Sequence, residues 1–170
     1  MECSGFGLLE LITDLEDPIG VEIGSDVGDT TEFLLSNHPS LRLTSIDPYI
    51  DYIDWNGNNL IGRDSTYNAF MNRVEKFGPR FSQIRMFSDD AADLIEDESL
   101  DFIFIDGLHT YDQLIKDCNN YYSKVKSGGI FAGHDYYAIA EVAKAVDEFS
   151  LKVNAQISHV KYDVWYWVKP

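Results

Sequence analysis

The stretch GVEIGSDVGDTT, residues 20–31, decides the fold of this chain. Residues 19–23 are short, largely apolar and β-branched, which is the pattern of a buried strand. The apolar run at 33–35 fits one face of a helix, and the Asp-Thr-Thr segment at 29–31 consists of residue types that cap helix N-termini. The spacing therefore predicts a strand, a tight glycine turn and a helix whose first N–H groups face a ligand.

An acidic residue in this strand indicates which class of ligand the turn binds. Any α/β protein needs glycines between strand and helix, so Gly24 and Gly28 alone specify nothing. Glu22, however, lies near the end of a buried strand, where a carboxylate is costly unless it meets an ammonium or hydroxyl donor. The turn also departs from the G-x-G-x-x-G spacing of nicotinamide-dinucleotide sites, because Asp26 stands in place of the middle glycine. A nucleoside ligand without a pyrophosphate fits better.

Composition restricts the class of protein. The chain has 170 residues, 45% of them hydrophobic, and a formal charge of −16, so we expect one acidic globular domain over residues 1–170. This charge disfavours nucleic acid and anionic membranes as partners. We expect no signal peptide, and no apolar run reaches the ~20 residues that span a bilayer. Cys3 and Cys118 form no metal or redox spacing, which indicates free thiols in a reducing cytoplasm.

Segments with strand and helix periodicity alternate along the rest of the chain. Further strands are predicted at residues 41–46, 81–87, 101–106, 130–132, 153–160 and 162–168, and further helices at 6–15, 65–77, 91–95, 111–125 and 139–149. The crossovers are long enough for parallel pairing, whereas the last two strands are joined tightly at Lys161. The predicted fold class is α/β, with a doubly wound, mostly parallel sheet and a terminal antiparallel hairpin.

Residues 49–64 form the least regular segment, with a length typical of a lid or binding loop. Tyr49, Tyr52 and Trp55 could form an apolar wall over a ligand, or pack as a small satellite cluster. Both interpretations stay open from the sequence.

Acidic residues and histidines follow several predicted strands. Asp47 lies about 20 residues beyond the glycine turn, where such folds hold ribose hydroxyls, although it could also initiate a turn before the next proline. Asp106 is followed by His109, and His134 precedes Asp135. The ends of parallel strands line a common crevice, so both histidines are candidate bases. Each could instead be structural, and Asp106 could cap a helix.

Five motifs carry a family resemblance: E-x-G-x-x-x-G at 22–28, Asp47, FIDG-x-H-x-Y at 104–111, the glycine pair at 128–129 and GHDY at 133–136. Together they resemble class I S-adenosylmethionine-dependent methyltransferases, especially the small subgroup similar to macrocin-type sugar O-methyltransferases. The resemblance spans nearly the whole chain. It implies a Rossmann-like, seven-stranded sheet that ends in the hairpin.

The resemblance also implies roles. S-adenosylmethionine would be the cofactor, with Asp47 on its ribose hydroxyls. The implied cofactor residues, from the methionine part to the adenine, are Glu22, Gly24, Ser25, Gly28, Asp106, Asp47, Ser88 and Asp89. In similar sugar methyltransferases, carboxylates after the fourth and fifth strands hold a divalent metal such as magnesium. Here these are Asp106 and Asp135, although His134-Asp135 stands where some relatives carry paired aspartates.

The expected activity is methyl transfer to the oxygen of a small hydroxylated acceptor, such as a sugar or glycosylated metabolite. This in-line displacement depends on positioning, and a hydroxyl acceptor also needs a base or a metal. The candidate catalytic residues are Asp106, His109 and His134. Residues 49–64, the N-terminal helix or a second subunit of a homo-oligomer would cover the acceptor. The alternatives are an NAD(P)-dependent oxidoreductase, against which the missing dinucleotide motif argues, and a cofactor-binding protein without catalysis.

Overall fold

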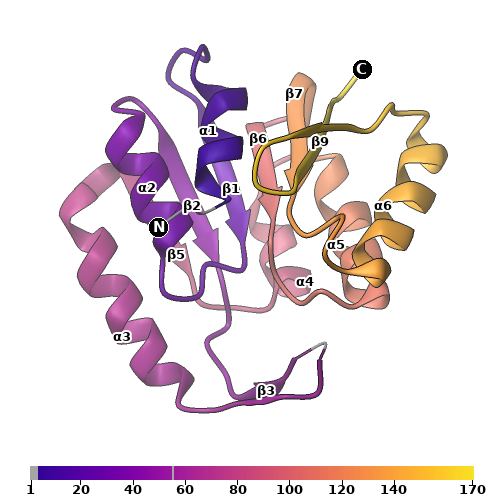
Figure 1. The fold of residues 1–170 in the computed structure, drawn as a ribbon. Helices are drawn as coiled ribbons and strands as arrows, with labels where there is room; N and C mark the ends of the chain where they lie inside the picture. The colour runs from indigo at the N-terminus through magenta and orange to yellow at the C-terminus, as the bar shows by residue number, and fades with distance from the viewer. Residues whose placement is uncertain (1–3, 55) are drawn as a thin grey trace.

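The computed structural model describes residues 4–54 and 56–170, which form a seven-stranded sheet with helices on both faces (Figure 1). Its strands are β1 (Ile19–Ile23), β2 (Arg42–Ile46), β5 (Phe81–Ile84), β6 (Leu100–Ile105), β7 (Val125–Gly133), β8 (Ser158–Val160) and β9 (Val164–Val168). The α-helices are α1 (Gly5–Ile12), α2 (Asp29–Asn37), α3 (Arg63–Val74), α4 (Ser88–Ala91), α5 (Tyr111–Tyr122) and α6 (Ala140–Val153). The 3-10 turns η1 (Glu75–Arg80) and η2 (Ala92–Leu94) follow α3 and α4.

The strand order is β5-β2-β1-β6-β7-β9-β8, with β9 antiparallel to both neighbours and the other pairs parallel. Strand β6 shows why helices cover both faces. Phe102 and Phe104 pack with α1 and α2, whereas Ile103 and Ile105 pack with α5 and α6, because successive side chains of a strand point to opposite faces. The predicted doubly wound sheet and terminal hairpin are confirmed.

Several predicted boundaries were wrong. Helix α6 continues to Val153, and Asn154 ends it with a left-handed φ of 54°, so β8 occupies only the end of the predicted strand 153–160. Strand β7 begins at Val125 instead of 130, because the glycine pair lies at a register shift within the strand and not in a turn. The predicted strand 81–87 ends at Ile84, and the N-terminal helix spans 5–12 instead of 6–15.

The irregular segment 49–64 contains a second, two-stranded sheet, β3 (Tyr52–Ile53) with β4 (Asn59–Leu60), before α3 begins. Tyr49 is buried against Phe70 and Val74, so the satellite-packing interpretation is correct for this residue. Trp55 and Cys3 lie outside the described residues. Cys118 is a buried free thiol. Among the helices of the described ranges, none combines the length and apolarity needed to cross a bilayer.

Candidate active site

A cleft of about 600 Å³ opens at the carboxyl ends of β1, β2 and β6, the edge at which open α/β sheets bind ligands. Its lining comes from the turn after β1, the end of β2, the β3–β4 hairpin, and the segments that lead into α4 and α5. The predicted cofactor residues that line it are Glu22, Gly24, Ser25, Asp47, Ser88 and Asp106. Gly28 and Asp89 are not part of this lining. The roles of all these residues toward a cofactor stay predictions.

Glu22 is almost fully buried at the end of β1. The hydroxyls of Thr31 and Ser45 both donate to its Oε2, with Ser45 at 3.0 Å. Thr31 was predicted as a helix cap, but its side chain serves this carboxyl instead. Burial raises the pKa of Glu22 to about 7, although the two hydroxyls lower it. Glu22 therefore changes charge near neutral pH.

The turn after β1 depends on glycine at Gly24. Its φ is +84°, and a Cβ there would lie 2.2 Å from the carbonyl oxygen of Asp106. The turn after β1 thus contacts the loop after β6, and this contact holds the two walls of the cleft together. Gly28, with φ +86°, is the N-cap of α2 and lies against Phe70, so its observed contact is structural.

Asp47 is buried at the end of β2 with both oxygens engaged. Oδ1 accepts from the backbone N–H of Tyr49 at 2.9 Å, and Oδ2 accepts from that of Asp26 at 3.2 Å. Arg63 Nη2 lies 3.7 Å from Oδ2, and its Nη1 lies 2.6 Å from Asp26. Burial raises the pKa of Asp47 despite these donors. Sequence reasoning missed Arg63, a buried cation whose only signal was its position at the end of the irregular segment.

Ser25 and Tyr49 connect the turn to the segment after β2. Ser25 Oγ lies 2.9 Å from Tyr49 Oη, which donates to the carbonyl of Asp26 at 2.9 Å. The backbone of Asp26 and Tyr49 has positive φ, 41° and 49°. Such conformations cost energy and persist only where surrounding contacts fix them. Tyr52, from the hairpin, lines the cleft as the wall interpretation requires.

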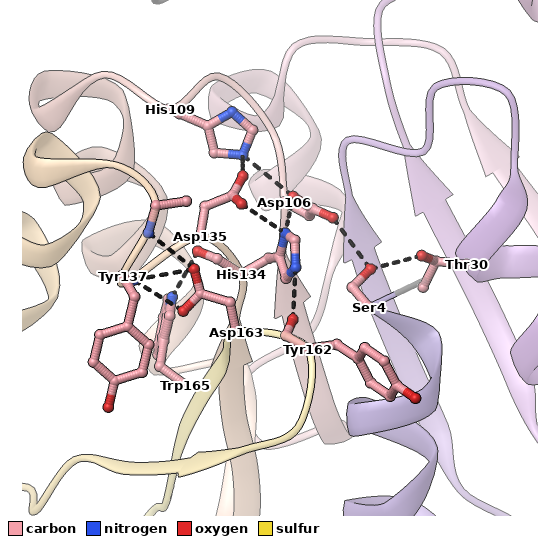
Figure 2. A network of polar contacts seen from close by, with 11 residues as sticks. Ser4, Thr30, Asp106, His109, His134, Asp135, Tyr137, Tyr162, Asp163 and Trp165 are labelled. Carbon is pink, nitrogen blue, oxygen red and sulfur yellow. Dashed lines mark hydrogen bonds and ion pairs between the residues drawn. The ribbon is translucent and has the colours of Figure 1, made fainter. Parts of the chain in front are cut away.

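Two carboxylates and two histidines meet beside the cleft, where β6 and β7 end (Figure 2). His109 Nε2 lies 3.2 Å from Asp106 Oδ1 and 3.1 Å from Asp135 Oδ2. His134 Nδ1 lies 3.1 Å from Asp135 Oδ1 and 3.6 Å from Asp106 Oδ1. The structure thus brings together all four residues that the sequence placed after these strands. Asp106 and His109 line the cleft itself.

The protonation of His134 follows from its partners. Its Nε2 lies 2.8 Å from the carbonyl oxygen of Tyr162, which can only accept, so Nε2 carries a proton. Nδ1 then faces carboxylates, and it either carries a second proton or offers its lone pair to a cation. Burial would lower the pKa of His134, but the hydrogen bonds to Asp106 and Asp135 outweigh it and raise the pKa to about 10. For Asp106, burial raises the pKa, but the two histidines outweigh it and hold the pKa well below its usual range.

Ser4, at the start of α1, extends this group toward the N-terminal helix. Its Oγ lies 2.9 Å from Thr30 Oγ1 and donates to Asp106 Oδ2 at 3.5 Å (Figure 2). The β8–β9 turn closes the other side, where Tyr162 and Asp163 both have positive φ. These elements place α1 and the terminal hairpin around the carboxylates.

Comparison with known proteins agrees with this geometry. The profile of a family described as "Methyltransferase domain" matches residues 21–136. The chain belongs to this methyltransferase family. It is an S-adenosylmethionine-dependent methyltransferase, which favours that prediction over the oxidoreductase and non-catalytic alternatives.

The chain is also similar to one protein in sequence and to two solved structures in fold. It is 27% identical over 157 residues to uncharacterized protein R132 of Acanthamoeba polyphaga mimivirus, covering 88% of this chain and 67% of that protein. The solved O-methyltransferase NovP is 16% identical with a TM-score of 0.68, covering 97% of this chain and 77% of that one. An O-methyltransferase from Bacillus cereus in complex with SAH is 15% identical with a TM-score of 0.68, covering 99% and 82%. At these identities the two structures support the fold.

Proposed function

We propose that this methyltransferase transfers the methyl group to an oxygen of a small hydroxylated acceptor, such as a sugar or glycosylated metabolite, as macrocin-type enzymes do. One observation carries the proposal: the two-carboxylate, two-histidine group lies at the same strand ends as the cleft, and Asp106 and His109 belong to both. A hydroxyl acceptor needs a group of this kind, because it is a weak nucleophile until its proton is removed. The solved O-methyltransferases with this fold are consistent with it.

The methyl donor would occupy the cleft. We assign its methionine part to Glu22, Gly24 and Ser25, and its ribose to Asp47. Asp47 already accepts two backbone hydrogen bonds, so its position is fixed before a ligand arrives. A preorganised acceptor loses little entropy when the ribose hydroxyls bind. The absence of a side chain at Gly24 lets the backbone of Asp106 and Gly107 pack directly against this turn, which brings the two walls of the cleft together.

His109 is the proposed base. Its Nε2 is held between Asp106 and Asp135, and the residue lines the cleft. The acceptor proton would pass to Nδ1 of this imidazole as the oxygen attacks the methyl carbon and the bond from that carbon to the sulfonium sulfur breaks, leaving the neutral thioether product. The two carboxylates, which face Nε2, would stabilise the imidazolium that forms. His134 fits this role less well, because its Nε2 is committed to Tyr162 and its pKa is about 10 without a metal.

The same residues fit a divalent metal. Asp106, His134 and Asp135 each offer a ligand atom, and these atoms lie within 4.8 Å of one another. The Nε2–H of His134 donates to a backbone carbonyl, the second contact that metal-binding histidines usually make. Nδ1 is then the nitrogen that would coordinate, after releasing the proton that it shares with Asp106 and Asp135. The two carboxylates suit Mg²⁺ or Mn²⁺, whereas an imidazole ligand is more typical of transition metals. When bound, such an ion would lower the pKa of an acceptor hydroxyl.

Four measurements test the proposal. Calorimetry should detect binding of S-adenosylmethionine and S-adenosylhomocysteine but not NAD; binding of NAD alone would overturn it. A screen of sugars, glycosides, amines and thiols should then give methylated products with hydroxyl acceptors only. Measuring methyl transfer after chelation with EDTA, and again after re-addition of Mg²⁺, distinguishes activation of the acceptor by a metal from activation by the base alone. Mn²⁺ titration of Asp135→Asn should show at least ~10-fold weaker binding than wild type if the metal assignment is correct.

A further inference from the structure

A buried carboxyl on α5 has no role in the site described above. Asp117 is 1% exposed, yet it is part of the cleft lining. An unpaired buried carboxylate is costly, so its contacts indicate what it serves. Asp117 lies on the same face of α5 as the buried residues Leu114 and Tyr121.

The hydrogen bonds to Asp117 involve one of its two oxygens. Ser88 Oγ donates to Oδ1 at 2.6 Å, and Gln113 Nε2 donates to Oδ1 at 3.1 Å. Gln113 Nε2 also donates to Ser88 Oγ at 3.2 Å, so Asp117, Ser88 and Gln113 are all hydrogen-bonded to one another. Among the described residues, no donor bonds to Oδ2. The carboxyl is therefore held in a fixed orientation, and Oδ2 keeps its capacity to accept a hydrogen bond.

The surroundings suit a planar, largely apolar ligand with one polar edge. Ile50, Phe87 and Leu108 line the same cleft and are exposed apolar side chains. Asp89, the acid that the family resemblance implied near the adenine, bonds instead to Gln113 and to Asn120 on α5. Asp117 is thus the buried acid that this part of the cleft presents.

We propose that Asp117 recognises the 6-amino group of the donor's adenine through Oδ2, with Ser88 and Gln113 fixing its orientation. The inference rests on the proposed binding of S-adenosylmethionine in this cleft. An ionised carboxylate can only accept hydrogen bonds, so it favours the amino group of adenine and repels the 6-oxo group of hypoxanthine. Asp117 is then a specificity-determining residue that distinguishes the adenosyl donor from its deaminated, inosyl form.

The substitution Asp117→Asn tests this recognition while keeping the hydrogen bonds that Ser88 and Gln113 donate to residue 117. The amide oxygen can keep the bonds from Ser88 and Gln113, while the amide nitrogen replaces Oδ2 and turns the available atom from an acceptor into a donor. Calorimetry at about pH 8 would compare S-adenosylhomocysteine with S-inosylhomocysteine. At that pH the carboxyl is ionised, because burial raises its pKa only to about 6. Asp112→Asn, on the exposed side of α5, is the matched control for charge.

Wild type and Asp112→Asn should bind the adenosyl compound about 10- to 100-fold tighter than the inosyl compound. In Asp117→Asn this ratio should fall at least ~10-fold, or invert. An unchanged ratio in a folded Asp117→Asn protein would overturn the inference. If this variant does not fold, Gln113→Leu, which removes one orienting donor, should still lower the ratio several-fold, and an unchanged ratio there would also refute it. Failure of wild type to bind either compound would instead overturn the proposed function.

Discussion

At the scale of single residues, Glu22 links the stability of the fold to pH. Its folded-state pKa of about 7 lies above the ordinary value of 4.5, so between these values the folded protein binds more protons than the unfolded one. The contribution of this group is then fully present below about pH 4.5 and is lost as the pH rises through about 7. The loss should be on the order of 2–4 kcal/mol.

Denaturant unfolding of wild type and Glu22→Gln at pH 5, 6, 7 and 8 measures this contribution. The free energy of unfolding should fall less steeply with pH in the variant, because glutamine cannot ionise. Glu75→Gln, at an exposed position in η1, controls for loss of one acid. Parallel pH curves for wild type and Glu22→Gln would show that Glu22 titrates normally.

Asp47 is the residue on which the ribose assignment depends. Asp47→Ala should weaken S-adenosylhomocysteine binding by about 1–3 kcal/mol, as expected when a charged hydrogen-bond partner is lost. The same change also frees the N–H groups of Asp26 and Tyr49, so part of the effect could come from the turn. A ribose-modified ligand separates the two. Wild type should bind 2′-deoxy-S-adenosylhomocysteine more weakly than S-adenosylhomocysteine, whereas Asp47→Ala should bind the two compounds equally.

At the scale of elements, the turn between β1 and α2 is closely packed at Gly24, where there is no room for a side chain. Gly24 and Gly57 have nearly the same φ, +84° and +83°, but a Cβ at Gly57 would meet none of the described residues within 4 Å. Gly57→Ala should therefore cost about 1 kcal/mol for its backbone conformation alone. Gly24→Ala should cost about 3 kcal/mol or more, since it also drives a methyl group into the β6 loop. Equal losses in denaturant unfolding would contradict this account.

The element scale also shows what the sequence could and could not predict. Apolar runs followed by Asp47, Asp106 and Asp135 predicted the ends of β2, β6 and β7 to within one residue, because parallel strands and their polar ends are local patterns. The buried acid Asp117 and the cation Arg63 were missed, since each owes its place in the cleft to packing between elements distant in sequence. The extension of β7 was missed for the same reason: its pairing with β6 overrides the turn preference of its glycines.

At the scale of the whole molecule, a formal charge of −16 acts on the donor and the product differently. The cleft lining includes the carboxyl groups of Glu22, Asp26, Asp47, Asp54 and Asp106, with Arg63 as a cation among them. The sulfonium of the donor carries a positive charge that the demethylated product lacks. If the donor binds in this cleft as proposed, a negative potential there attracts it and favours release of the product.

Salt should reveal this preference. Raising the ionic strength from about 0.01 M to about 1 M shortens the screening length from ~30 Å to ~3 Å. The affinity for S-adenosylmethionine should then fall several-fold more than the affinity for S-adenosylhomocysteine, which serves as the internal control because it has the same purine, ribose and amino-acid groups. Calorimetric titrations at both salt concentrations give the two slopes. Identical slopes would show that the acidic surface is too distant or too well screened to distinguish the ligands, and that short-range contacts alone set the preference.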